Sequence, residues 1–302
     1  MTRFYTLDVF TDHLFGGNAL AVILDSRGVP EESMQKIARE FNLSETVFVL
    51  PARGADAVRR LRIFTPEREL PFAGHPTIGT AHLLWELGVA PAAKDGVVEF
   101  VLEEEVGLVP IRIVSRNEDL PFVRLTTAQL PEEGPPAPGR EVLAAALGLG
   151  PQDLASGEDR PEAYSCGVPY LFVPLRSREA LRRATPDLAR WRTTLDPYWA
   201  PQVYLFCREP ERPGSQLRAR MFAPTLGVFE DPATGSAVAS LAGYLAARMP
   251  DRDGTHQWIV EQGFEMGRPS ILTLELEMRS GILDAVRVGG TAVRVSEGDL
   301  RI

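Results

Sequence analysis

The feature that most restricts the fold of this 302-residue chain is a predicted helix with almost no polar face. It covers residues 235–248 and consists mainly of Ala, Leu, Val, Gly and Tyr. A helix that is apolar all round is buried on every side. A second predicted helix, residues 77–87, is similar, although His82 and Glu86 interrupt its apolar surface. We therefore expect two central helices, each enclosed by other elements.

Both helices follow turns rich in Gly and Pro. The first turn and helix start is residues 71–80 (PFAGHPTIGT), and the second is residues 230–237 (EDPATGSA). The start of a helix offers unpaired backbone N–H groups and the positive end of the helix dipole, so it binds anions readily. Two such starts in matching positions predict a site for a small carboxylate between two similar halves.

The rest of the chain predicts strands and a few helices around this pair. Pro- and Gly-rich residues 131–139 are the strongest linker signal and predict domains at 1–128 and 129–302. The last strand, about residues 291–302, is a candidate for packing with the first domain. The simplest architecture is an α+β fold in which each domain is a curved sheet wrapped around one central helix. The predicted strands are residues 3–10, 19–24, 46–50, 58–64, 97–102, 108–114, 122–125, 168–174, 203–207, 217–222, 258–260, 271–277 and 286–295.

Composition excludes several classes of function. The net charge of −9 argues against a nucleic-acid partner, because phosphate binding needs a basic surface. There is no apolar run long enough to span a bilayer and no basic segment leading into an apolar core, so we expect a cytoplasmic protein without membrane contact. Cys166 and Cys207 form no metal-binding or disulfide pattern, which predicts two buried or half-buried thiols and no metal site.

Three side chains are candidates for the chemistry. Glu45 precedes the apolar strand 46–50; a carboxyl desolvated there has a raised pKa and can take and return a proton near neutral pH. His75 stands at a helix start, where it should resist protonation and suits an orienting role, or serves as a cap or structural imidazole. Asp231 also precedes a helix start, so a role as N-cap stays open beside a functional one.

Small residues at the two helix starts are candidates for an anion cradle. Gly74 and Gly235 allow the backbone to come close to a ligand, and Ser236 adds a hydroxyl. The alternative is that each turn is simply too tight for any residue but Gly.

The chain resembles the phenazine-biosynthesis isomerase family (PhzF-like proteins), which is similar in fold to diaminopimelate epimerase. The matching segments follow one another along nearly the whole chain. They are residues 17–22 (GNALAV), 37–46 (IAREFNLSET), 62–66 (RIFTP), 69–76 (ELPFAGHP), 220–224 (RMFAP), 230–237 (EDPATGSA), 262–263 (QG) and 267–270 (GRPS).

The resemblance implies two similar domains with mostly antiparallel sheets, an active site between them and a homodimer. Glu45 matches the acid/base glutamate of the family, and His75 and Asp231 match residues that contact polar groups of the substrate. The positions implied around the bound acid are Asn18, Ser44, Gly74, Gly235 and Ser236. The family reaction moves a proton between ring carbons of a dihydro-hydroxyanthranilate, and it implies no metal, flavin or nicotinamide cofactor.

Two alternatives to this isomerase differ from it in the residues they need. The related epimerases use two cysteines near the two helix starts, but Cys166 and Cys207 lie outside both motifs, which argues against a two-thiol racemase. A non-catalytic module that binds a small acid or a protein partner would keep the fold without chemistry. The intact set of Glu45, His75 and Asp231 favours the enzyme.

Overall fold

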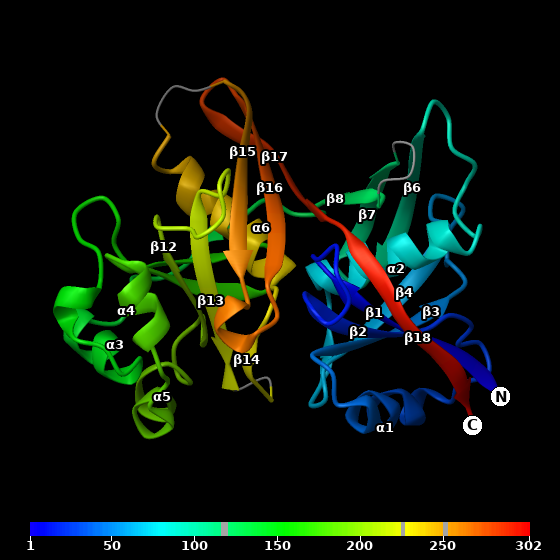
Figure 1. Cartoon of the computed structure of the whole chain (residues 1–302), viewed down its shortest axis with the longest axis horizontal. Helices are drawn as coiled ribbons and strands as arrows, with labels where there is room; N and C mark the ends of the chain where they lie inside the picture. Colours follow the sequence, from blue (N-terminus) through cyan, green and yellow to red (C-terminus); the bar gives the residue numbers. More distant parts are fainter. Residues whose placement is uncertain (116–119, 225–226, 250–252) are drawn as a thin grey trace.

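The computed structural model describes residues 1–115, 120–224, 227–249 and 253–302, and it contains two halves that lie side by side (Figure 1). Among the described residues, the first half holds two helices and eight strands. These elements are β1 (Thr2–Val9), β2 (Asn18–Ile23), α1 (Glu31–Phe41), β3 (Glu45–Leu50), β4 (Arg59–Phe64), β5 (Glu69–Leu70), α2 (Gly74–Glu86), β6 (Val97–Glu104), β7 (Gly107–Val114) and β8 (Phe122–Thr126).

The second half adds small helices on its outer side. Its elements are β9 (Glu132–Glu133), α3 (Arg140–Ala146), the 3₁₀ helix η1 (Pro151–Asp153), β10 (Glu162–Ser165), β11 (Pro169–Pro174), α4 (Arg178–Arg183), α5 (Leu188–Thr194), β12 (Gln202–Cys207), β13 (Leu217–Ala223), β14 (Val228–Asp231), α6 (Gly235–Ala246), β15 (Gly254–Gln262), the 3₁₀ helix η3 (Phe264–Met266), β16 (Ser270–Arg279), β17 (Ile282–Gly290) and β18 (Ala292–Leu300).

The strand pairings of the first half are repeated in the second. In the first half β1–β2, β3–β4, β4–β5 and β6–β7–β8 are antiparallel, whereas β2–β3 and β4–β6 are parallel. In the second, β10–β11, β12–β13, β13–β14 and β15–β16–β17 are antiparallel, whereas β11–β12 and β13–β15 are parallel. The predicted fold of two similar, mostly antiparallel halves is therefore confirmed.

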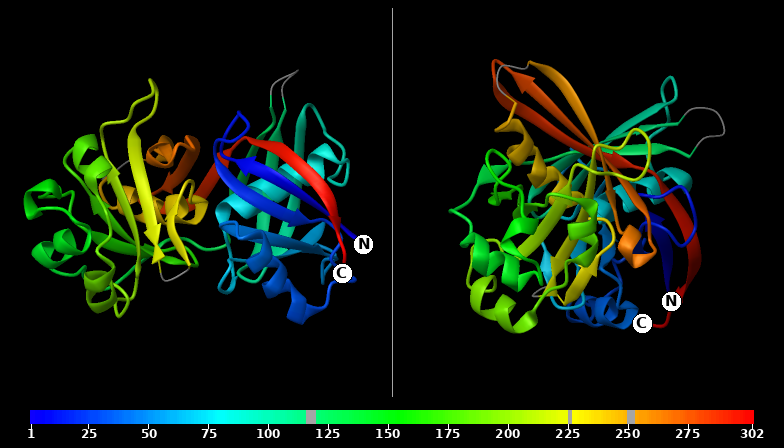
Figure 2. Two further views of the ribbon diagram at one scale, coloured as in Figure 1. Left: turned by 60° about the horizontal axis from the view of Figure 1, so that its bottom comes forward. Right: turned by 60° about the vertical axis from the view of Figure 1, so that its left-hand side comes forward.

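Two strand pairs connect the halves in the described part of the chain. The antiparallel pair β8–β17 joins the two sheets, whereas the short strand β9, which lies in the segment predicted to be a linker, pairs with β10 inside the second half. At the end of the chain β18 leaves the second half and lies along β1 (Figures 1 and 2). The prediction of one strand over residues 286–295 was therefore wrong, because Thr291 separates β17 from β18. The boundary between residues 128 and 129 stays a prediction.

Helices α2 and α6 are the centres of the two halves. Every residue from Gly74 to Leu84 of α2 is buried, and so is every residue from Gly235 to Ala242 of α6. The two cysteines are also buried and free, as expected. Burial of apolar side chains is the main favourable contribution to folding, so these helices have no alternative position at the surface.

The two central helices meet at their first residues. A Cβ atom on Gly74 would lie 2.5 Å from the Cα atom of Gly235, and one on Gly235 would lie 2.8 Å from the Cα atom of Gly74. Real Cβ contacts are never that short, so each glycine permits the close approach of the other. This contact brings the two helix N-termini together between the halves.

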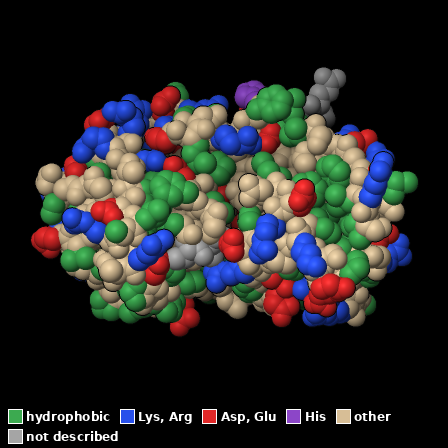
Figure 3. All heavy atoms as spheres, turned by 90° about the horizontal axis from the view of Figure 1, so that it is seen from below, with side chains coloured by type: hydrophobic (Ala, Val, Ile, Leu, Met, Phe, Trp, Pro, Cys, Tyr) green, Lys and Arg blue, Asp and Glu red, His purple; other side chains and the backbone are tan. Residues whose placement is uncertain are grey.

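The surface carries charges of both signs. On the face drawn in Figure 3, Lys and Arg are interspersed with Asp and Glu and do not gather in one basic patch. Within the described ranges, none of the helices is both long enough and apolar enough to cross a membrane.

Candidate active site

A small cavity lies where α2 and α6 meet. Its volume is about 20 Å³, which is room for about one water molecule. A larger open groove of about 580 Å³ runs along residues 10–16 and contains none of the candidate acidic groups. The lining of the small cavity comes from both halves and includes Glu45, His75, Tyr170, Asp231, Gly235 and Ser236.

Glu45 is the first residue of β3, and its strand position is set by parallel pairing with Leu20 of β2. Its side chain is only 14% exposed, and Oε2 has no hydrogen-bond partner although it lies 3.3 Å from Nε2 of His75. Burial raises the pKa of Glu45 well above its usual value, and the nearby charge of Asp231 adds to the effect. This is the direction that its apolar surroundings predict.

His75 is the second residue of α2, and its side chain is 3% exposed. Burial lowers its pKa to about 3, while a backbone hydrogen bond with Ala19 acts in the opposite direction. His75 is therefore neutral near pH 7, so its contact with Glu45 is not an ion pair. The sequence predicted this resistance to protonation from the helix start, but the main physical cause is burial.

Asp231 is the last residue of β14 and is buried. Its Oδ2 accepts a hydrogen bond of 2.5 Å from the Thr234 hydroxyl, and its Oδ1 accepts one of 2.7 Å from Nδ2 of Asn18. Burial raises its pKa to about 6, although hydrogen bonds from Thr234, Asn18 and Ser44 lower it. Thr234, not Asp231, occupies the N-cap position of α6, so Asp231 is not the helix cap.

Asn18 joins Asp231 to His75. Besides Asp231, its Nδ2 donates to the carbonyl oxygen of Ala233 at 2.9 Å and lies 3.2 Å from Nδ1 of His75. The two oxygen acceptors establish which amide atom is the nitrogen. An amide nitrogen has two hydrogens, and the two oxygens are its closer partners, so Asn18 is held by Asp231 and Ala233 and lies against the ring of His75.

The remaining predicted residues lie around this cluster. Ser44 bonds to Asp231, and the Ser236 hydroxyl lies 2.7 Å from the hydroxyl oxygen of Tyr170. Gly74 and Gly235 line the cavity and also pack against each other. All eight predicted site residues are thus brought into one region by elements from both halves.

Sequence reasoning missed two side chains of this region. Tyr170 of β11 lines the cavity, and no motif in its segment pointed to it. Gln262 of β15 donates to the carbonyl oxygen of Asp231 at 2.8 Å and to Oγ1 of Thr234 at 2.9 Å. The short family segment at residues 262–263 was the available signal for Gln262.

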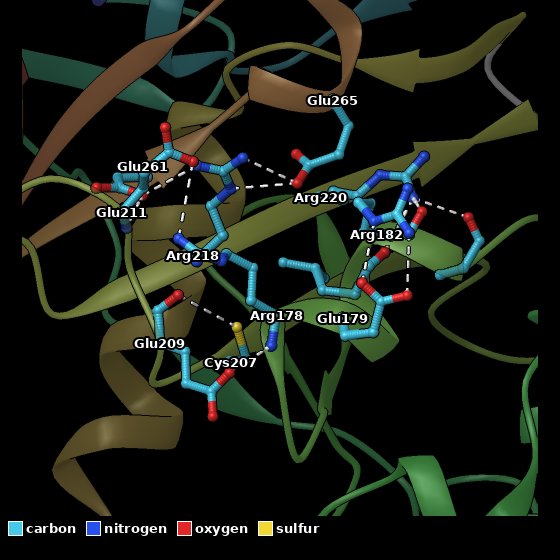
Figure 4. Close-up of polar contacts among 12 residues, drawn as sticks. Arg178, Glu179, Arg182, Cys207, Glu209, Glu211, Arg218, Arg220, Glu261 and Glu265 are labelled. Atoms are coloured by element: carbon cyan, nitrogen blue, oxygen red, sulfur yellow. Dashed lines mark hydrogen bonds and ion pairs between the residues drawn. The ribbon is translucent and has the colours of Figure 1, made fainter.

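Buried ion pairs support the strand that carries Asp231. Arg220 of β13 donates twice to Glu230 at 2.8 Å and once to the carbonyl oxygen of Ala184 at 2.8 Å. Arg218 on the same strand lies between Glu261 and Glu265, at 3.1 and 2.9 Å (Figure 4). Bidentate and fully paired arginines hold planar carboxylates in one geometry, so β13 and β14 keep Asp231 in place.

The site has the chemical character of a proton-transfer centre. It combines a buried carboxyl with a raised pKa, a neutral imidazole and two converging helix N-termini. In the part of the chain that the structure describes, no group of three or more His, Cys, Asp and Glu side chains is arranged to hold a metal ion. The fold and the site together define a protein of two similar α+β halves with a buried acidic site between them.

Comparisons with known proteins identify the family within this class. The family model described as phenazine biosynthesis-like protein (PhzC-PhzF) matches residues 7–298. An uncharacterized isomerase from Mesorhizobium japonicum is 45% identical, with 100% of this chain and 99% of the relative covered. The trans-2,3-dihydro-3-hydroxyanthranilate isomerase of Pseudomonas aeruginosa is 37% identical, with 99% of each chain covered. The chain therefore belongs to the phenazine biosynthesis-like (PhzF) family and is an enzyme of the isomerase class.

Solved structures agree with this assignment. A PhzF-family protein from Bacillus anthracis has a TM-score of 0.87 and 29% identity, and covers 100% of this chain and 99% of its own. A probable proline racemase from Agrobacterium radiobacter, at 15% identity and a TM-score of 0.66 with 100% of this chain and 93% of its own covered, shares the fold alone.

Proposed function

We propose that this chain is a cofactor-independent isomerase of a small cyclic or unsaturated carboxylic acid, with Glu45 as the proton shuttle. The observation that carries the proposal is the unpaired Oε2 of Glu45, which faces neutral His75 inside the cavity. A carboxyl with a raised pKa removes a proton as a carboxylate and returns it as an acid, and the efficiency of both steps is greatest when the pKa lies near the working pH.

The substrate carboxylate would bind at the helix N-termini. The first N–H groups of α2 and α6 have no partner within their own helices, and both helix dipoles present their positive ends there. The hydroxyl groups of Ser236 and Tyr170 add donors beside them. Holding the acid at this end directs its reacting carbon toward Glu45, and His75 and Asp231 orient its other polar groups.

Substrate entry requires the two halves to separate. The cavity of about 20 Å³ is far smaller than the roughly 300 Å³ of a typical small-molecule site. We infer that the described conformation is the closed one and that water is excluded during proton transfer.

Proton exchange tests the proposal directly. The protein is incubated in D₂O with trans-2,3-dihydro-3-hydroxyanthranilate, the substrate named for the P. aeruginosa relative, and with related unsaturated acids, and loss of C–H signals is followed by NMR. We expect exchange that Glu45→Gln reduces by at least about 10³-fold. Glu104→Gln is the matched control, because Glu104 is a buried carboxyl of the same half that does not line the cavity.

Two results would contradict the proposal. Exchange of equal rate in Glu45→Gln would assign the proton transfer to another group. Carboxylate binding by calorimetry without any exchange would favour the non-catalytic binding module.

The homodimer and the cytoplasmic location are also proposals. The family resemblance supports the homodimer, which sedimentation velocity measures. The sequence predicts the cytoplasmic location, which cell fractionation measures.

A further inference from the structure

The segment 267–270 matches the family but has no part in the cavity. Its Arg268 reaches from the second half into the first, where its Nε donates to the carbonyl oxygen of Gly17 at 2.8 Å. Its Nη2 donates to the carbonyl oxygen of Gly16 at 2.6 Å and to Oδ1 of Asp8 at 2.5 Å. One guanidinium therefore holds both carbonyl groups that precede Asn18.

Asp8 supports the turn at residues 15–17, which precedes Asn18. It is 3% exposed, and its Oδ2 accepts a hydrogen bond of 2.6 Å from the backbone N–H of Phe15. The backbone N–H of Gly17 donates to the carbonyl oxygen of Pro269 at 3.2 Å. The turn at residues 15–17 is thus held on one side by Asp8 and on the other by the segment that carries Arg268.

Asn18 needs this support because its amide nitrogen has more acceptors nearby than it has hydrogens. The Nδ2 atom has two hydrogens but three acceptors within 3.2 Å, namely Asp231, Ala233 and His75. The contact with His75 is the longest of the three. A small rotation or shift of the Asn18 backbone would lose this contact before the other two, and would change the surroundings of Nδ1 of His75.

We propose that Arg268 is a positioning residue, which holds Asn18 in the place where its amide joins Asp231 to His75. This inference rests on the proposed function, in which His75 and Asp231 orient the substrate. The order of contacts is Arg268, the carbonyl groups of residues 16 and 17, Asn18 and His75. The second half thereby controls a hydrogen bond inside the first.

The chain contains a matched arginine for comparison. Arg140 is half-buried, as Arg268 is, and each of its Nε, Nη1 and Nη2 atoms donates to a backbone carbonyl oxygen, those of Pro151, Ala155 and Leu154. Arg140 is not one of the residues that line the cavity. Loss of its hydrogen bonds should reduce stability without reaching His75.

The test replaces each arginine with lysine and observes the histidine side chains. In Arg268→Lys the ammonium group still pairs with Asp8, but one nitrogen cannot replace the separate Nε and Nη2 donors. Long-range ¹H–¹⁵N spectra report the tautomer of each imidazole. We expect the ring ¹⁵N signals of His75 to shift in Arg268→Lys and to stay unchanged in Arg140→Lys. The signals of His82, on the same helix, should stay unchanged in both.

Asn18→Ala provides a second route to the same answer. It removes the amide without touching Arg268, so we expect the same change in the His75 signals. Unchanged His75 signals in Arg268→Lys or in Asn18→Ala would overturn the proposal, and so would equal changes in the two arginine variants. If the acids that the wild type exchanges are known, kcat of Arg268→Lys should fall about tenfold with KM nearly unchanged. If the wild type exchanges none, the proposed function fails, whereas the spectra still decide the role of Arg268.

Discussion

Glu104 offers the clearest test of how burial controls protonation in this protein. It is the last residue of β6, is 5% exposed, and its Oε1 lies 2.5 Å from Oγ1 of Thr77. The Thr77 hydroxyl also donates to the carbonyl oxygen of Ala73 at 2.7 Å. The hydroxyl of Thr77 thus has two acceptors, the Ala73 carbonyl oxygen and Oε1 of Glu104.

Burial raises the pKa of Glu104 to about 8, although the Thr77 hydrogen bond acts in the opposite direction. Its ordinary value is 4.5. Because the folded-state pKa is the higher one, the stabilisation is fully present below pH 4.5 and is lost as pH rises through about 8. Between these two pKa values the contribution of Glu104 to the free energy of unfolding falls by about 1.4 kcal/mol per pH unit. On the order of 4 kcal/mol of stability is therefore lost between pH 5 and 8.

Glu104→Gln should remove this dependence. The amide oxygen of Gln accepts from Thr77 as the carboxyl oxygen does, without a titratable proton, so the two proteins should differ little at pH 5. At pH 8 the variant should be more stable by roughly 2–4 kcal/mol. Urea unfolding at pH 5, 6, 7 and 8 measures the free energy of unfolding of the two proteins. The contributions of Glu45, Asp231 and the histidines are common to both and cancel when the two free energies are subtracted. Parallel curves for the two proteins, or a variant that is less stable at pH 8, would refute the reasoning.

Three further outcomes follow from the site. Gly74→Ala should lower the free energy of unfolding by on the order of 1–3 kcal/mol, because its Cβ overlaps the backbone of Gly235. Gly28→Ala is the control, since a Cβ there has nothing within 4 Å, and thermal unfolding measures both variants. Equal losses of stability in the two variants would contradict the contact. If Glu45 acts first as a base, its raised pKa predicts that exchange increases as pH rises through its titration and then levels off; a flat profile would argue against it. Tyr170→Phe should raise KM for the acid about fivefold with kcat nearly unchanged, since it removes one donor from the anion end; an unchanged KM would exclude Tyr170 from binding.

Local patterns in the sequence were sufficient for the elements and the general architecture. The apolar helices at residues 77–87 and 235–248 predicted two central helices, and both are buried as α2 and α6. The Gly- and Pro-rich turns predicted their starts to within three residues, since α2 begins at Gly74. The division of residues 286–295 between β17 and β18 was missed, because a continuous β-rich pattern does not show which sheet each part joins.

Local chemistry and the family resemblance predicted the site residues, but the geometry of the site depends on how the two halves pack. The low pKa of His75 was predicted in direction, yet its main cause is burial by both halves, which no helix-start motif reports. Nothing in the sequence pointed to Tyr170, because a Tyr in an apolar strand is typical of the hydrophobic core.

By itself, the sequence determined that two apolar helices had to be buried, that their first turns favour an anion, and that the chain belongs to one isomerase family. Only the tertiary structure decided that Gly74 touches Gly235, that Asn18 joins Asp231 to His75, and that Arg268 holds the turn before Asn18. The physical reason is the separation along the chain over which each kind of interaction acts. Helix and turn preferences act over a few neighbouring residues, whereas these contacts join positions far apart in the chain and depend on how the two halves pack.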